Sequence, residues 1–183
     1  YVLWADHDEL RRERRVSVDI FATTDELLKP GENAPDPDLL DVFVAARAAL
    51  VADAECKLLL ETIARECQVV DSDGRVAAEG SRYHAFPVGL AFVASDDLGA
   101  FDADVPLAFN EIRLDSLAGG GREVPMSRAR AERHALYRQA VRSCAEVRRR
   151  EGNCDLGAVR VHARLRDNGR AVWMTGSADM AFV

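Results

Sequence analysis

The segment that most constrains the fold lies near the C-terminus, where residues 167–170 read Asp-Asn-Gly-Arg between two alternating stretches. Asn and Gly tolerate the positive φ angles of a tight hairpin turn, so this tetrapeptide predicts two antiparallel strands. With Asn-Gly at the tip, Arg164 is expected to pair with Trp173. One face of the hairpin then carries apolar side chains at every second position, and this face must lie against a core.

The same periodicities predict the remaining elements. Apolar residues alternate with polar ones in further stretches that we expect to be strands, at 16–22, 68–70, 76–78, 83–94 and 105–115. Apolar residues recur every three to four positions in two longer stretches, which predicts helices over 37–66 and 128–150. Asp36 and Ser127 are suitable N-caps for these helices, and Gly152 is a typical helix terminator.

The resulting order is β-α-β-β-β-β-α-β-β. Short turns between successive strands indicate antiparallel pairing, and two amphipathic helices need an apolar sheet face to cover. We therefore predict an α+β fold, a two-layer sandwich with a mostly antiparallel sheet covered by two long helices. A length of 183 residues suits one domain over 1–183, with 1–13 as a peripheral or truncated N-terminal segment.

The four cysteines form no CxxC motif and have no histidine at zinc-finger spacing. Cys56 and Cys67 fall on the predicted helix 37–66, which places them about 16 Å apart, so we expect no bond between them. Cys144 and Cys154 flank a helix end and can meet only if the chain reverses tightly, so their pairing stays open. We expect four small, partly buried thiols in a reducing compartment.

Charge is distributed unevenly along the chain. Residues 1–115 contain 11 Lys and Arg against 24 Asp and Glu, whereas residues 116–183 contain 13 against 7, for a net charge of −7. This split predicts two electrostatic faces on one domain, or oppositely charged surfaces that meet in an oligomer. Only Lys29 and Lys57 are lysines. The arginine bias is typical of a GC-rich genome, bacterial or phage, and weakens any inference of binding from arginine alone.

Two basic clusters are candidate binding sites. On the polar face of the C-terminal hairpin, cations beside an aromatic ring can hold a phosphate or stack a nucleobase. This hairpin cluster consists of Arg160, His162, Arg164, Arg166 and Trp173. On the helix 128–150, residues spaced by four form a stripe that can bind nucleic acid or an acidic neighbouring subunit. This helix stripe consists of Arg130, His134, Arg138 and Arg142. Both clusters also fit ordinary solvated surfaces.

No motif in the sequence names a reaction. There is no Gly-x-Ser-x-Gly and no phosphate loop, and the triple glycine at 119–121 is expected to be a flexible tether. The run Asp-His-Asp-Glu at 6–9 lacks the further ligands that a metal-dependent hydrolase requires. The paired carboxylates at 96–104 do not fit an EF-hand. We expect no metal and no cofactor, and catalytic residues are unknown.

These observations favour a non-catalytic binding or assembly module that acts through protein–protein contacts and self-associates, with a second copy or an acidic protein as its partner. One alternative is a nucleic-acid-binding domain that uses the helix 128–150 and the Trp173 face. Another is an enzyme or small-ligand-binding domain of unknown reaction. No apolar run is long enough to span a membrane. We expect a cytoplasmic protein, with export left open because the sequence begins at Tyr1 rather than Met.

Overall fold

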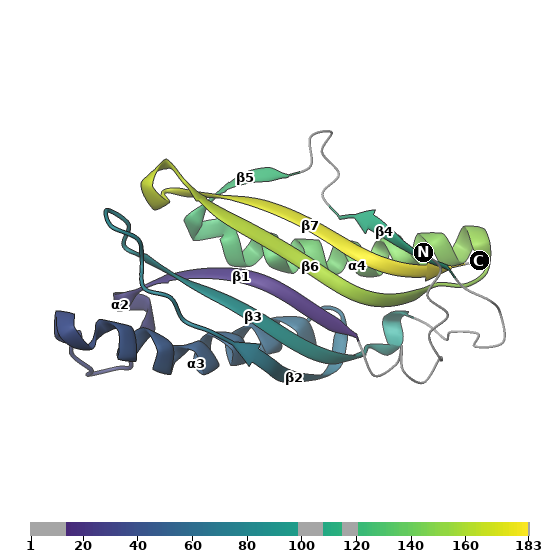
Figure 1. Cartoon of the computed structure of the whole chain (residues 1–183). Helices are drawn as coiled ribbons and strands as arrows, with labels where there is room; N and C mark the ends of the chain where they lie inside the picture. The colour runs from purple at the N-terminus through teal and green to yellow at the C-terminus, as the bar shows by residue number, and fades with distance from the viewer. Residues whose placement is uncertain (1–13, 99–107, 115–120, 183) are drawn as a thin grey trace.

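A computed structural model describes residues 14–98, 108–114 and 121–182 (Figure 1). Its strands are β1 (Arg15–Thr23), β2 (Ala64–Ser72), β3 (Tyr83–Ala94), β4 (Ala108–Arg113), β5 (Arg122–Pro125), β6 (Asp155–Arg166) and β7 (Ala171–Phe182). Its α-helices are α2 (Thr24–Leu27), α3 (Leu40–Leu60) and α4 (Ala129–Glu151). Short 3₁₀ turns at Pro37–Leu39 and Met126–Arg128 lead into the two long helices.

The seven strands form one sheet in the order β2-β3-β1-β6-β7-β4, with β5 also paired to β7. Every pairing is antiparallel except the one between β1 and β6. The helix α3 packs on β2 and β3, and α4 packs on β6 and β7, so both cover the same face (Figure 1). The predicted two-layer α+β sandwich is therefore confirmed.

The fold contains an internal duplication. The elements β1-α3-β2-β3 form an N-terminal unit, and β5-α4-β6-β7 form a C-terminal unit with the same succession. In each unit the third strand lies between the other two, in the orders β2-β3-β1 and β6-β7-β5. The units join through the parallel β1–β6 pair, so they stand side by side in the same orientation. Their long helices consequently run in the same direction.

Each unit also contains one disulfide, and the two bonds occupy similar positions. Cys56 on α3 is bonded to Cys67 on β2, and Cys144 on α4 is bonded to Cys154 just before β6. Both pairs have a Cα–Cα distance of 5.6 Å. In both units, a disulfide therefore ties the C-terminal part of the helix to the chain that returns along the sheet.

The expectation that Cys56 and Cys67 cannot bond was wrong, because α3 ends at Leu60 rather than near residue 66. The apolar spacing continues past the helix end through Ile63, which is fully buried although it follows the helix. The second pairing, which the sequence left open, is present because the chain does reverse tightly. Gly152 ends α4 with a φ of 83°, a conformation that glycine adopts without strain.

Several strand predictions hold, and others do not. The bounds of β3 and the C-terminal hairpin register, with Arg164 opposite Trp173, are confirmed. The turn at 167–170 is wider than a two-residue turn, with positive φ angles at three successive residues. Residues 76–78 form no strand, and the short strand β5 was not predicted. Of the stretch 105–115, residues 108–113 form β4, while 105–107 lie outside the described residues.

The core lies between the sheet and the two long helices. Its largest fully buried side chains come from all of these layers and include Tyr137, Phe86, Leu58, Ile63 and Met180. Within the described residues, no helix is both long and apolar enough to cross a membrane.

We expect each disulfide to add about 3 kcal/mol to the free energy of unfolding, because each closes a short loop in the unfolded chain. The double variants Cys56→Ser/Cys67→Ser and Cys144→Ser/Cys154→Ser should each lose about that amount in urea unfolding. Alkylation of the denatured, unreduced protein followed by mass spectrometry gives the direct check. Alkylation of all four cysteines without reductant would contradict both bonds.

Candidate functional site

A cavity of about 390 Å³ opens between the two long helices, and we call it the interhelical groove. Its floor and walls are largely apolar and include Ile20 and Ala22 of β1, Leu27 of α2, and Val51 and Ala54 of α3. Its charged lining residues are Glu26, Lys29, Arg47, Glu55, Arg130 and Arg133. The groove therefore draws on both units and on the chain that connects α2 to α3.

A buried ion pair crosses from one helix to the other beside this groove. The Nε atom of Arg133 donates to both carboxylate oxygens of Glu55, at 3.0 and 3.1 Å. The hydroxyl of Tyr137 donates to the same carboxylate at 2.7 Å. Only 2% of Glu55, 8% of Arg133 and none of Tyr137 is exposed. Burial, together with the negative charge of Glu55, raises the pKa of Tyr137 well above its ordinary value.

This network fixes the spacing of the helices. A buried carboxylate without its cation, or a buried guanidinium without its anion, costs several kcal/mol, roughly 3–5. Separation of α3 from α4 would leave both Glu55 and Arg133 in that state. The network therefore holds the groove at a defined width, with a donor on each oxygen of the Glu55 carboxylate.

The rim of the groove is basic. An Nη atom of Arg47 contacts the carboxylate of Glu32, and its guanidinium lies 4.7 Å from the centre of the Phe43 ring. The Nε atom of Arg47 is buried and has no hydrogen-bond partner among the described residues. Arg130 lies 3.7 Å from Glu61, and both of these side chains are largely exposed.

A second cavity, of about 520 Å³, lies at the end of β3 and is lined by His84 and Thr24. The backbone amide of Ala77 donates to Nδ1 of His84 at 3.0 Å, so the proton of the neutral ring is on Nε2. Nε2, which lies 2.9 Å from the Thr24 hydroxyl, is therefore the donor to it. In this arrangement His84 cannot take a proton from Thr24, so the pair is structural rather than nucleophilic.

The hairpin cluster lies on the face of the sheet opposite to the helices, where several of its members already have partners. Arg160 donates to Asp179 through both Nη atoms, at 2.9 and 2.6 Å. His162 lies 3.3 Å from a carboxylate oxygen of Asp19. The charge of Arg160 is thus partly neutralised, and one ring nitrogen of His162 is engaged, before any ligand arrives.

Trp173, the aromatic member of the hairpin cluster, is half-buried. The guanidinium of Arg166 lies 5.9 Å from its ring centre, whereas Arg164 is its partner in strand register. A Cβ atom on Gly121 would lie 2.4 Å from Nε1 of the indole, so the backbone at this glycine packs closely against the ring. A base could therefore stack on Trp173 only where Gly121 and Arg166 leave the ring open.

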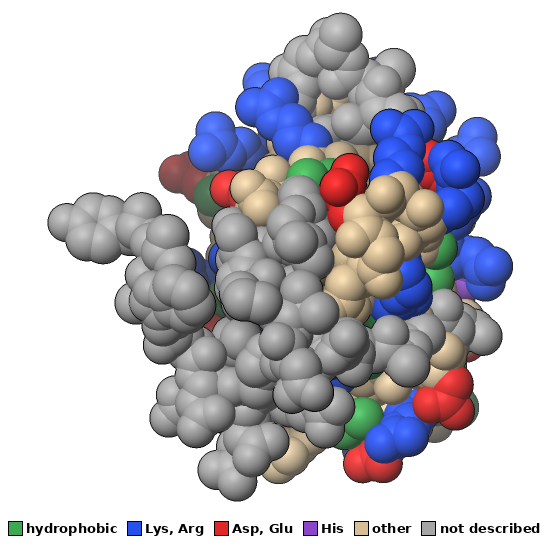
Figure 2. Space-filling view, turned by 90° about the vertical axis from the view of Figure 1, so that its right-hand side faces the viewer, with side chains coloured by type: hydrophobic (Ala, Val, Ile, Leu, Met, Phe, Trp, Pro, Cys, Tyr) green, Lys and Arg blue, Asp and Glu red, His purple; other side chains and the backbone are tan. Residues whose placement is uncertain are grey.

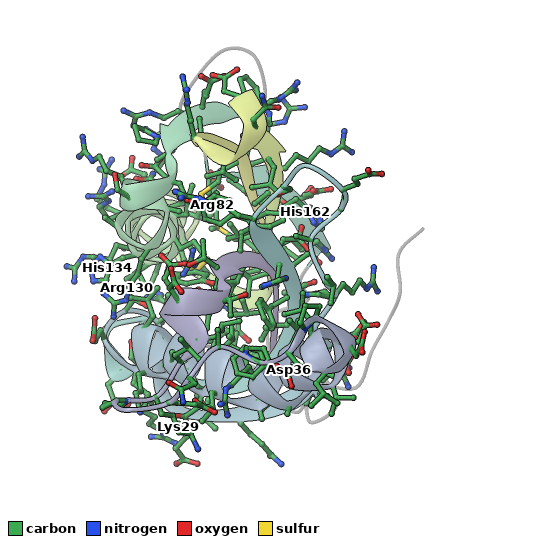
Figure 3. The ribbon with its side chains drawn as sticks, turned by 90° about the vertical axis from the view of Figure 1, so that its left-hand side faces the viewer. Lys29, Asp36, Arg82, Arg130, His134 and His162 are labelled. Carbon is green, nitrogen blue, oxygen red and sulfur yellow. A yellow bond between two sulfur atoms is a disulfide. The ribbon has the colours of Figure 1, made fainter. Side chains whose placement is uncertain are left out.

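The helix stripe follows the outer side of α4, where Arg138 and Arg142 are exposed and His134 is half-buried. Figure 3 shows Arg130 and His134 on the helix side of the sheet and His162 on the other side. The two predicted clusters are therefore not brought together into one surface.

The charge split along the sequence becomes a split between the two units. The end view in Figure 2 shows Lys and Arg side chains gathered over its upper half, where the C-terminal unit lies. The last turn of α4 contributes Arg148, Arg149 and Arg150 to this basic region. Glu146 contacts two of these arginines, and their hydrogen bonds lower its pKa to about 2.

Among residues 14–98, 108–114 and 121–182, no three His, Cys, Asp or Glu side chains are grouped as metal ligands would be. The predictions for the runs at 6–9, 102–104 and 119–120 fall outside the described residues. Comparison of the chain with protein-family models, curated proteins and solved structures gave no match.

Sequence reasoning missed the residues that form the groove network. Alanines do not mark the buried face of α4, because Ala131 and Ala135 are both exposed. The buried face instead contains Ala129, Arg133, Leu136, Tyr137, Ala140 and Cys144. The spacing of four between Arg133 and Tyr137 was a usable signal, but an arginine is rarely buried without a partner, and its partner Glu55 is far away in the sequence.

We expect Glu55→Leu and Arg133→Met each to lower the free energy of unfolding by roughly 3–5 kcal/mol, because each leaves the other charge buried alone. The double variant should recover most of that loss, which urea unfolding in a double-mutant cycle will measure. The matched control is the exposed pair of Glu61, which follows α3, and Arg130 of α4, where removal of either charge should cost under about 1 kcal/mol. Equal, additive losses at the two pairs would contradict the role of the buried network.

We expect His84 to make the protein less stable as the pH falls. Burial lowers the pKa of His84 below its ordinary value of 6.5, so the unfolded chain takes up a proton that the folded protein resists. The stabilising contribution of neutral His84 is complete above its ordinary pKa of 6.5, and it declines as the pH drops to about 5.5. Urea unfolding at about pH 7.5 and about pH 5.5 measures this effect. Between these two values, the free energy of unfolding should decline less for His84→Gln, which retains an amide donor and does not titrate, than for the unaltered protein.

Proposed function

We propose that this chain is a non-catalytic binding module whose binding site is the interhelical groove. The observation that carries the proposal is the cavity of about 390 Å³ between the two units, with its apolar floor and charged rim. Small-molecule sites are typically concave, mostly apolar pockets of ~300–1,000 Å³ with a few polar groups, and they occur between helices and at domain interfaces. The groove has each of these properties.

The rigidity of the groove supports binding rather than catalysis. The Glu55 carboxylate is buried and is held by Arg133 and Tyr137, so its charge is already engaged within the protein. The raised pKa of Tyr137 keeps its hydroxyl protonated, and His84 belongs to a different cavity. The groups that could exchange protons beside the groove therefore serve to hold its walls in place.

The two disulfides favour an oxidising compartment as the place where the domain acts. Disulfides persist in secreted and periplasmic proteins and are rare in the reducing cytosol. We therefore propose an extracytoplasmic location in place of the cytoplasmic one that the composition suggested. The similar position of both bonds in the two units further indicates that they are part of the duplicated design.

A neutral, apolar fluorescent probe such as N-phenyl-1-naphthylamine tests the groove directly. We expect saturable binding at one site, and we expect Ala54→Phe, which fills the groove, to abolish it. Ala45→Phe is the matched control, because Ala45 is exposed on α3 and does not line the groove. Equal binding by both variants, or no saturable binding by the unaltered protein, would refute the groove as a binding site.

Self-association through the open face of the sheet is a second candidate. In β3 the side chains on this face are small and half-buried, at Ala85, Pro87, Gly89 and Ala91. Such a face suits close packing of another protomer, and the unequal charges of the two units suit a partner of complementary charge. This candidate retains the expectation of a protein partner, either a second copy or an acidic protein.

Nucleic-acid binding has less support as a third candidate. The helix stripe and the hairpin cluster lie on opposite faces, so one strand of nucleic acid could not follow both without passing around the domain (Figure 3). In the hairpin cluster, Asp179 and Asp19 compete with phosphate for Arg160 and His162.

A further inference from the structure

We propose that the ligand of the interhelical groove is a small amphipathic carboxylate, with its charged head at the basic rim and its hydrocarbon body on the apolar floor. This inference rests on the proposed function, because it assigns a ligand class to the same groove. Ile20, Ala22, Val51 and Ala54 offer hydrocarbon surface but no hydrogen bonds, so a body without polar groups fits best there.

The lining charges favour an anion over a cation. Both lining carboxylates are engaged: Glu55 in the buried network, and Glu26 with the backbone amide of Thr23 at 2.7 Å. Among the described residues, by contrast, Lys29 has no ion-pair partner. The charged side chains that line the groove are four cations and two carboxylates, so the lining is net positive.

Arg47 places a guanidinium at the wall of the groove. Its Nε atom is buried with no hydrogen-bond partner among the described residues, which is a costly state for an N–H donor. Glu32 and the Phe43 ring already hold the guanidinium in place at the groove wall. The Nε atom itself is closed to solvent, so a ligand carboxylate would accept from the outer nitrogens of this guanidinium, and charge-assisted hydrogen bonds of this kind are about twice as strong as neutral ones.

The start of α4 adds to the same field. Arg130 stands in the first turn of this long helix, and no side chain caps the helix N-terminus. The dipole of the helix gives that end a partial positive charge, which favours an anion nearby. Lys29, Arg47 and Arg130 thus come from three separate elements of the chain to line one cavity.

Calorimetric titration with octanoate and with octanamide, which has the same body and a neutral head, tests the charge preference. We expect one octanoate per chain, bound about tenfold or more tightly than octanamide, as one charge-assisted hydrogen bond implies. Arg47→Met should remove that advantage while leaving the affinity for octanamide unchanged. Lys29→Gln, on an exposed loop where it cannot disturb folding, should weaken octanoate alone. Arg142→Met, which lies outside the groove, is the control.

Glu32→Gln provides a test in the opposite direction. It removes the carboxylate that competes for Arg47, so octanoate should bind more tightly than to the unaltered protein. Equal affinity for octanoate and octanamide, or octanoate binding that Arg47→Met and Lys29→Gln leave intact, would overturn the carboxylate assignment. If Ala54→Phe still abolishes binding of the neutral fluorescent probe in that case, the groove remains a binding site and only the assigned ligand class is wrong.

Discussion

The buried contact of Glu55 with Arg133 and Tyr137 is the interaction on which the arrangement of the two halves depends. On the sheet side the units meet through the short parallel pairing of β1 with β6, whose register extends only from Val16–Val159 to Val18–Val161, and through side chains such as Arg14, which pairs with Asp155. A sheet junction of this length fixes the strands but leaves the helices free to tilt. The ion pair adds a second, directional connection on the helix side. Movement of one helix away from the other would leave Glu55 and Arg133 buried without their partners, at a high cost in free energy.

The duplication explains why a groove forms at this place. The helix α3 packs on β2 and β3, and α4 packs on β6 and β7, so β1 lies between the two helices and its end at Ile20 and Ala22 lines the groove. The α2 segment and the loop that follows it close the groove at one end, and Lys29 and Arg47 line it there. A buried polar network and a half-covered apolar floor are thus both consequences of two identical topologies set side by side.

Local patterns predicted the elements whose chemistry is local. The hairpin register followed from a turn sequence and strict alternation, and the bounds of β3 followed from alternation alone. Predictions failed where distant residues decide the outcome. The disulfide of Cys56 depends on where α3 stops, and the burial of Arg133 depends on Glu55, which is remote in sequence. The internal repeat is visible in the strand order and in the positions of the disulfides rather than in similar sequences of the two units. A fold tolerates replacement of most residues, so two copies of one topology can lose their sequence similarity.

The common orientation of the two units means that they are related mainly by translation along the sheet. Such a relation has no twofold axis, and the two edges it leaves are different: β2 at one side, and β4 with β5 at the other. The strand β2 is the counterpart of β6, while β4 and β5 take the place that β1 occupies beside β3. Copies joined with β2 of one against the β4 and β5 edge of the next would therefore repeat the internal junction head to tail and grow as an open polymer, whereas a closed dimer has to pair like with like, either the same edge of both copies or the same face.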